Sequence, residues 1–408
     1  MPILRMPSPS LFVLLVASLA ALGQFAIATY LPAFDAIGAD LAASPAQVQQ
    51  SLTAYLLPFA MAIPWHGAIS DAVGRRGFIL GGLLLFCAGS LLCALAPSID
   101  WLFAGRVLQG LSAGVGIVVG RAMLRDRFDG VLAQKQLAMV AILFSLAPAL
   151  APLCGGWLLP LVGWRGIFIF LCLISALLWL GCWRHLDETL AAGRRQSLQP
   201  LALLRGFNEL LRSGRYLLVC LANAGVNAAI YLYVLSAPTF VTRHLGLGPQ
   251  SFAWLFLPIV AGLLLGSFAA HRMAGRLPPA RGVLIGYAVM LAAVLLNIGA
   301  ALWLPVGVPW SLLALPPFAI GLMLTQPGLQ LLALDRFPER RGLASSGYVT
   351  LQQAGNALSA ALLVPLLLGS TLSLALGMAA LACLALLAFG LAQVGARAEQ
   401  PISKEQNA

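Results

Sequence analysis

The sequence is poor in charged residues. Only 9% of its 408 residues are Asp, Glu, Lys or Arg, whereas soluble proteins contain about 25%. A soluble protein of this length cannot cover its surface with so few charges, so the composition excludes a soluble enzyme, a secreted domain and a disordered chain. Hydrophobic residues instead make up 61% of the sequence. This composition indicates a polytopic membrane protein.

Several chemical motifs are absent as well. None of the seven cysteines forms a C-x-x-C pair, which argues against a disulfide framework and a metal site. There is no H-E-x-x-H motif and no phosphate-binding G-x-x-x-x-G-K-[ST] loop, so we expect no enzymatic activity, no ATP hydrolysis and no cofactor. Any transport by this chain is expected to draw on an ion or substrate gradient.

Twelve stretches are long and apolar enough to cross a bilayer, which requires about 20 residues. The longest polar stretch separates the first six from the last six. We therefore expect an all-α membrane protein with twelve transmembrane helices in two six-helix, pseudo-symmetric halves, a construction found in secondary transporters. The expected parts are an N-terminal half at 1–183, a cytoplasmic linker at 184–214, a C-terminal half at 215–395 and a cytoplasmic tail at 396–408. The expected spans are 11–34, 47–69, 77–97, 101–122, 136–160, 164–183, 215–240, 251–271, 281–302, 308–334, 343–369 and 372–394.

The basic residues indicate the orientation of these spans. They number 24, against 13 acidic residues, but they do not gather in one region as a nucleic-acid-binding surface would require. All but Arg106, Arg165 and Arg243 fall on one side of the twelve-span arrangement. Because loops rich in Lys and Arg stay in the cytoplasm, both termini and the linker are predicted to be cytoplasmic.

The loop after the second span, residues 67–76, has the sequence GAISDAVGRR. Gly67 permits close helix approach, Gly74 permits a tight turn, and Asp71 can cap a helix N-terminus. Arg75, followed by Arg76, can pair with a carboxylate such as Asp126 at the cytoplasmic end of the fourth span. The alternative is a plain basic turn between two helices.

Arg106 is the one formal charge expected deep in the membrane. An arginine there costs roughly 2.5 kcal/mol or more unless it faces a partner or water. Gln109 lies one turn further on, so both side chains can face one cavity. No acidic residue is expected at mid-membrane, so an anionic or polar acceptor group of a substrate is one possible partner; water, Gln109 and backbone carbonyls are others. A snorkelling interfacial arginine is the competing interpretation.

Polar side chains in the other spans tend to face the bundle interior, where they line a cavity or bond between helices. The candidate substrate-cavity residues, besides Arg106 and Gln109, are Gln24, Tyr30, Tyr55, Asn223, Asn227, Tyr231, Gln326 and Gln352. In the fifth span Pro148, Pro152, Gly155 and Gly156 predict a helix that bends and packs tightly, although membrane helices are rich in Pro and Gly generally.

Three of these segments resemble signatures of the major facilitator superfamily: the loop 67–76, the run Arg106-Val107-Leu108-Gln109-Gly110, and the Pro- and Gly-rich fifth span, typical of antiporter branches. The runs 30–33, 163–165 and 333–346 resemble the Bcr/CflA-type exporters of the drug:proton antiporter group. The resemblance implies that the loop is a conformational latch, formed by Gly67, Asp71, Gly74, Arg75, Arg76 and Asp126. It also implies proton-driven export of small amphipathic molecules, drugs or metabolites, across the bacterial inner membrane by alternating access, by a monomer.

One departure from that pattern concerns the residue that would carry the proton. The family usually has an acidic residue two positions before Tyr30, and this sequence has Ala28. The proton carrier is therefore open, with Asp35 and His66 as weak candidates. The alternatives kept for function are a dedicated exporter of one neutral or anionic metabolite, such as a siderophore, and a non-transporting membrane sensor on the same fold.

Overall fold

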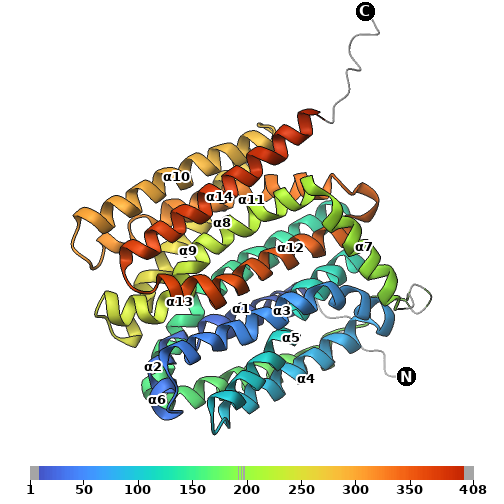
Figure 1. Cartoon of the computed structure of the whole chain (residues 1–408). Helices are drawn as coiled ribbons and strands as arrows, with labels where there is room; N and C mark the ends of the chain where they lie inside the picture. The colour runs from blue at the N-terminus through green and yellow to red at the C-terminus, as the bar shows by residue number, and fades with distance from the viewer. Residues whose placement is uncertain (1–8, 192, 194, 196–197, 399–408) are drawn as a thin grey trace, which may run out of the picture. The chain divides into compact units, whose positions relative to one another are not determined.

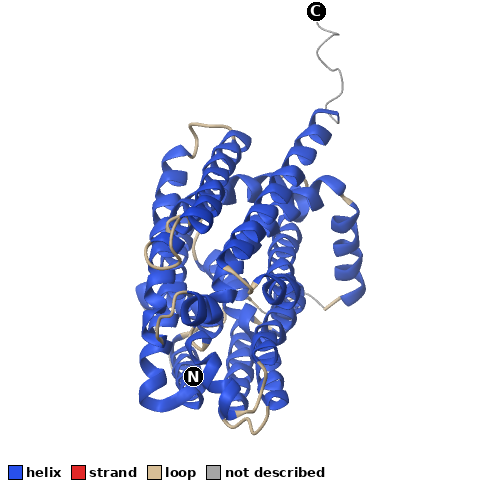
Figure 2. Ribbon diagram, turned by 60° about the vertical axis from the view of Figure 1, so that its left-hand side comes forward, coloured by secondary structure: helices blue, strands red, loops and turns tan. Residues whose placement is uncertain are grey.

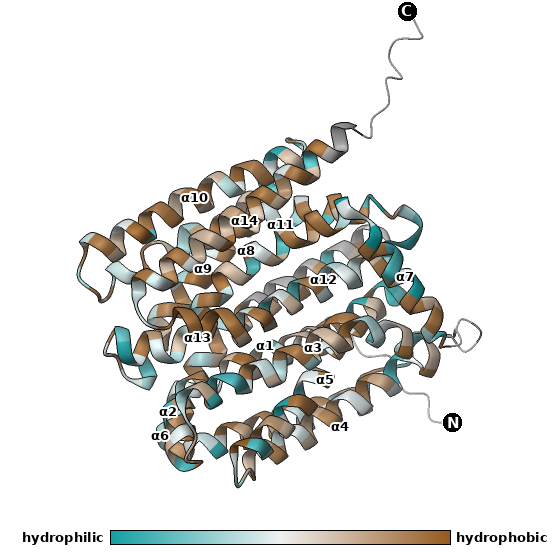
Figure 3. Ribbon diagram, in the orientation of Figure 1, coloured by the Kyte–Doolittle hydropathy of each residue, from teal (hydrophilic) through white to brown (hydrophobic). Residues whose placement is uncertain are grey.

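The computed structural model describes residues 9–191, 193, 195 and 198–398. Within these ranges every regular element is a helix and no strand is present (Figure 2). Ten helices of the described chain are long and apolar enough to cross a membrane, and apolar residues recur along their length (Figure 3). The predicted all-α membrane fold is confirmed.

The chain forms two compact units. The first contains Met1–Leu198, Val234–Val260 and Ala360–Leu368, and the second contains Gln199–Tyr233, Ala261–Ser359 and Gly369–Ala408. The expected division into two six-helix halves and a linker stays a prediction.

Helices α1 to α6, labelled in Figure 1, make up most of the first unit. α5 contacts α1, α3, α4 and α6, and glycines allow two of these approaches. A Cβ on Gly110 would lie 2.2 Å from the Tyr55 carbonyl oxygen, and one on Gly116 would lie 2.1 Å from that of Leu19. A larger residue at either position would push α5 away from α3 or α1. The six helices are α1 (Pro9–Ala28), α2 (Phe34–Asp40), α3 (Pro45–Val73), α4 (Arg75–Ala94), α5 (Ile99–Arg127) and α6 (Gly130–His185).

The second unit is built around α10, which packs against α11 and α14. α8 and α9 begin or end in this unit and continue into the first, which also holds the short elements η3 (Phe240–His244), η4 (Pro249–Phe252) and α13 (Val364–Leu367). The helices of the second unit are α7 (Pro200–Arg212), α8 (Gly214–Thr239), α9 (Ala253–Met273), α10 (Pro279–Trp303), α11 (Leu315–Leu334), α12 (Arg341–Leu358) and α14 (Thr371–Ala398).

Two of the expected span boundaries and spans can be compared with interruptions in the observed helices. The expected spans 136–160 and 164–183 both lie in α6, and Gly163 interrupts that helix with φ 68° and ψ 179°. The expected span 343–369 runs through α12, the π-helical segment η7 (Ser359–Leu363) and α13. The number twelve stays a prediction, because ten helices of the described chain meet the length and composition that crossing requires.

Candidate functional site

Arg106 is wholly buried on α5. Its guanidinium carbon lies 4.3 Å from the ring centre of Tyr30 and 4.3 Å from that of Tyr55. Each such cation–π contact contributes about 0.5–2 kcal/mol. Nη1 donates to the Ala26 carbonyl oxygen at 3.1 Å and to Gln109 Oε1 at 2.7 Å. The structure thus brings together four predicted cavity residues, Arg106, Gln109, Tyr30 and Tyr55.

Serines that the sequence analysis did not identify complete this cluster. Gln109 Nε2 donates to Ser90 Oγ at 2.8 Å. The Tyr30 hydroxyl lies 3.0 Å from Ser51 Oγ, and the Tyr55 hydroxyl donates to a main-chain oxygen of α1 at 2.8 Å. Because these bonds hold both rings against the guanidinium, the cation sits in a fixed polar pocket inside an apolar bundle.

Two nitrogens of Arg106, which together carry three N–H groups, remain unpaired among the described residues. Nε and Nη2 have no hydrogen-bond partner among the described residues, and none of the acidic residues described is fully buried. A buried cation without a carboxylate is costly. The sequence predicted that Arg106 faces a cavity, whereas in this conformation two tyrosines enclose it. Whether these N–H groups contact a substrate stays a prediction.

A second polar cluster lies in the second unit, between α8 and α12. Asn223 Nδ2 donates to Gln352 Oε1 at 3.1 Å, and Gln352 Nε2 donates to Asn227 Oδ1 at 3.1 Å. Asn227 Nδ2 completes the ring by donating to Asn223 Oδ1 at 3.0 Å. Each amide donates one bond and accepts one, so this amide triad joins three predicted cavity residues in a closed circuit.

Further amides surround the triad on α12. Asn356 Nδ2 donates to Gln353 Oε1 at 3.0 Å, and both side chains are buried. Gln353 Nε2 and Asn356 Oδ1 have no hydrogen-bond partner within the part of the chain described. Of the other predicted cavity residues, Gln24 is buried on α1, and Tyr231 and Gln326 are half-buried on α8 and α11.

The loop between α3 and α4 is held by ion pairs of Arg75. Its Nε lies 3.2 Å from Asp126 Oδ2, as the sequence predicted, and its Nη1 lies 2.5 Å from Asp71 Oδ1. Gly74 has φ 103°, a conformation that favours glycine, so the expected tight turn is present. The close approach expected at Gly67 is not required, because a Cβ there would meet its nearest neighbour at 3.9 Å.

The carboxylate that caps α4 is Glu188, and the expectation that Asp71 caps a helix is wrong. Asp71 lies in the last turn of α3. Glu188 Oε1 accepts from the Arg75 N–H at 3.0 Å, and Oε2 accepts from the Arg76 N–H at 3.2 Å. Since helix N-termini leave N–H groups unpaired and carry partial positive charge, a carboxylate there is stabilising. The Arg76 guanidinium binds the Trp183 carbonyl oxygen at 2.6 Å.

The opposite end of α3 carries a different polar contact, also within the first unit. Gln49, which is buried, donates from Nε2 to the Leu235 carbonyl oxygen at 3.2 Å. Gln50 donates from Nε2 to the Ala361 carbonyl oxygen at 3.2 Å. In an α-helix that oxygen would accept from residue 365, which is a proline and has no N–H. We call these two bonds the glutamine gate. Sequence reasoning missed it because both acceptors are main-chain atoms.

Comparison with family models identifies the family to which this chain belongs. Residues 13–360 match the model of the Major Facilitator Superfamily. The chain belongs to that superfamily. It is similar to the uncharacterized MFS-type transporter YdgK of Bacillus subtilis (strain 168), with 36% identity over 64% of this chain. The match spans 65% of the length of YdgK, slightly less than two thirds. Similarity to the multidrug transporter MdfA of Edwardsiella ictaluri (strain 93-146) is 30% identity over 73% of each chain.

Solved facilitator structures share the fold. The D-xylose-proton symporter superimposes with a TM-score of 0.74 and 14% identity, over 94% of this chain and 97% of that one. The human organic anion transporter MFSD10 (TETRAN) superimposes with a TM-score of 0.67 and 18% identity, over 96% of this chain and all of that one. At such identities the likeness concerns the fold alone.

The Pro- and Gly-rich segment of this facilitator lies inside α6 and remains helical. Pro148 and Pro152 are within the helix. A Cβ on Gly155 would lie 1.7 Å from the Thr29 carbonyl oxygen, and one on Gly156 would lie 2.4 Å from that of Pro249. The tight packing expected of these glycines is therefore present. Bending of this segment between conformations stays a prediction.

The two residues that the sequence analysis named as weak candidates for a proton carrier differ in environment. Asp35 is exposed in the first turn of α2. His66 is buried on α3, with Nε2 2.9 Å from the Leu111 carbonyl oxygen. A carbonyl accepts only, so Nε2 carries the hydrogen. Nδ1 has no hydrogen-bond partner among the described residues, so it is the atom of this imidazole that a proton would reach.

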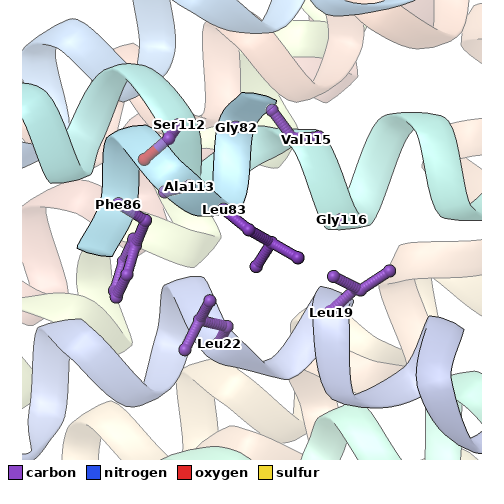
Figure 4. Close-up of a pocket in the computed structure, with 9 residues that line it drawn as sticks. All are labelled: Leu19, Leu22, Gly82, Leu83, Phe86, Ser112, Ala113, Val115 and Gly116. Carbon is purple, nitrogen blue, oxygen red and sulfur yellow. The ribbon is translucent and has the colours of Figure 1, made fainter. Parts of the chain in front are cut away.

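A small void lies between α1, α4 and α5 (Figure 4). Its wall is apolar apart from Ser112, which donates to main-chain oxygens of its own helix. The run GLSAG at 110–114 matches the letters of G-x-S-x-G, but it lies inside a helix and lacks the strand-to-helix turn of a nucleophile. With about 10 Å³ of free volume, the void accommodates at most one water molecule and is too small for cargo.

Proposed function

We propose that this facilitator exports small amphipathic molecules, drugs or metabolites, across the bacterial inner membrane by alternating access and proton antiport. We place it in the Bcr/CflA-type branch, as a monomer with two six-helix halves and cytoplasmic termini. The observation that carries the proposal is the polar contact at each end of α3. The glutamine gate lies near its first turn and the Arg75 ion pairs lie beyond its last. A protein that opens to two sides in turn needs a releasable closure at both ends.

The names of two relatives support the kind of cargo. The similar proteins from Edwardsiella are named multidrug transporters. The predicted orientation places the glutamine gate on the periplasmic side and the Arg75 loop, the proposed latch, on the cytoplasmic side.

The two polar clusters favour neutral or anionic cargo over polycations. Arg106 presents a positive charge with two free donors. The amide triad and its neighbours present only neutral donors and acceptors. None of the described acidic side chains is fully buried, so the buried interior of the described chain supplies no carboxylate to neutralise a polycation. This chemistry also supports the second candidate, a dedicated exporter of one neutral or anionic metabolite.

The experiment is transport by purified protein in liposomes with an imposed pH gradient. Cationic, neutral and anionic amphipathic probes are each measured with the gradient, without it, and with a protonophore. We expect gradient-dependent movement of neutral and anionic probes. Movement of the cation alone would refute the cargo assignment, and gradient-independent flux would refute antiport. Absence of flux for every probe would favour the sensor.

Arg106→Ala tests whether the arginine contacts cargo. We expect the variant to lose transport of the anionic probe while transport of the neutral probe falls less. Equal transport of the anion by variant and parent would exclude Arg106 as its partner.

A further inference from the structure

We propose that α7 (Pro200–Arg212) lies in the membrane–water interface and binds anionic lipid. Only Ser213 separates the end of α7 from α8, which begins at Gly214 and opens the membrane span Gly214–His244. One residue spans less than about 4 Å. The C-terminal end of α7 is therefore confined to the surface of the bilayer.

One face of α7 is fixed on α12. Gly206 and Leu210 are buried. A Cβ on Gly206 would lie 2.6 Å from a methyl carbon of Leu343, and a Cβ on Gly347 would lie 3.1 Å from one of Leu210. The ion pair of Glu209 with Arg340 adds a third contact between α7 and the start of α12. The helix consequently has a defined rotation and does not turn its other face inward.

The opposite face of α7 carries three uncovered leucines, with the exposed Asn208 among them. Leu201 is 69% exposed, Leu204 is 53% exposed and Leu211 is 49% exposed. Spacings of three and seven residues place these leucines on one side of a helix, about half a turn from Gly206 and Leu210. We call this surface the leucine face. If this face stays in water, the chain lacks the favourable free energy that burial of leucine side chains ordinarily provides.

Charge identifies what covers the leucine face. Arg205 and Arg212 are exposed and each directly follows a leucine of that face. A helix with leucines on one side and arginines beside them is typical of a segment that lies in the plane of the interface, with apolar side chains at the acyl boundary and guanidinium groups at the lipid phosphates. A protein partner would not by itself explain why this face lies at the bilayer surface.

The test uses the full-length protein in nanodiscs of phosphatidylcholine, with or without phosphatidylglycerol. A fluorescent probe is attached to a cysteine at position 204 in a variant lacking the seven native cysteines. The matched probe is at Ala202, exposed on a side of α7 away from the leucine face. We expect nitroxide-labelled lipid to quench the probe at 204, and aqueous iodide to quench the probe at 202. Equal quenching by iodide at both positions would overturn the proposal.

A second measurement needs no cysteine removal. Arg205→Gln/Arg212→Gln is compared with the unmodified protein for the rise in melting temperature that phosphatidylglycerol produces. We expect each arginine removed to weaken the preference for anionic lipid about fivefold. An identical rise in both proteins would refute the role of the arginines.

Protection of the probe at 204 from both quenchers, increasing with protein concentration, would show that a second copy covers the face. Neither readout depends on transport, so the proposed function stands or fails separately.

Discussion

Removing the glutamine gate tests whether it closes one end of the bundle. In Gln49→Ala/Gln50→Ala both side-chain donors are lost, so the carbonyl oxygens of Leu235 and Ala361 no longer accept these side-chain hydrogen bonds. A hydrogen bond of this kind contributes about 0.5–1.5 kcal/mol. Each substitution therefore raises the equilibrium constant for opening about 2- to 13-fold. The two bonds reach different acceptors, so the double variant should approach the product of the two effects.

The assay measures access to a buried position beside the gate. Ser236 is wholly buried and follows Leu235 on α8, so Ser236→Cys in a cysteine-free protein is a small change that reports opening. The rate of labelling by a membrane-impermeant maleimide is measured from the periplasmic side. In the double variant we expect the labelling rate to rise by about the product of the two single-substitution factors, because opening admits the reagent.

Gln47→Ala is the matched control for the gate. Gln47 lies in the first turn of α3, two residues before Gln49, but its side chain bonds only locally, in a capping box with Ser44. We expect little change in labelling. An unchanged labelling rate in the double variant, or an equal rise in the control, would refute the gate.

Three further outcomes follow from contacts described above. Glu188→Gln removes the charge that caps α4 and should lower stability by roughly 0.5–2 kcal/mol; an unchanged melting temperature would contradict the cap. Gly110→Ala forces a methyl group against the Tyr55 carbonyl oxygen and should cost about 1–3 kcal/mol, whereas Gly81→Ala on α4, with open space around it, should not destabilise. Arg106→Lys keeps the charge but loses the planar group between the tyrosines; transport and stability equal to the parent would show that charge alone suffices.

The helical architecture was predictable because of how few charges the sequence contains. Long apolar runs have one structural solution in a bilayer, so composition was enough to predict an all-α fold. The break at Gly163 also agreed with the expected boundary between the fifth and sixth spans. Local pairs were within reach too: Arg106 and Gln109 are three residues apart on one helix and are in contact.

Contacts between distant segments were not predictable from one sequence. Asn223 and Gln352 lie 129 residues apart, and no local pattern relates their positions. Glu188 lies 113 residues from the N–H group it caps. The enclosure of Arg106 depends on how two aromatic rings are oriented. Sequence patterns do not specify that orientation.

Pro365 has a consequence that reaches beyond its own helix. A proline in a membrane segment is usually considered for the bend it introduces, yet here it leaves the Ala361 oxygen available to a glutamine 311 residues away. Restoring an N–H at position 365 gives that oxygen a donor within its own segment, in competition with the distant amide. The residue at position 365 should thereby affect the bond that Gln50 makes to this oxygen. Substitutions at the two positions should accordingly show less than additive effects, as though they altered a single bond.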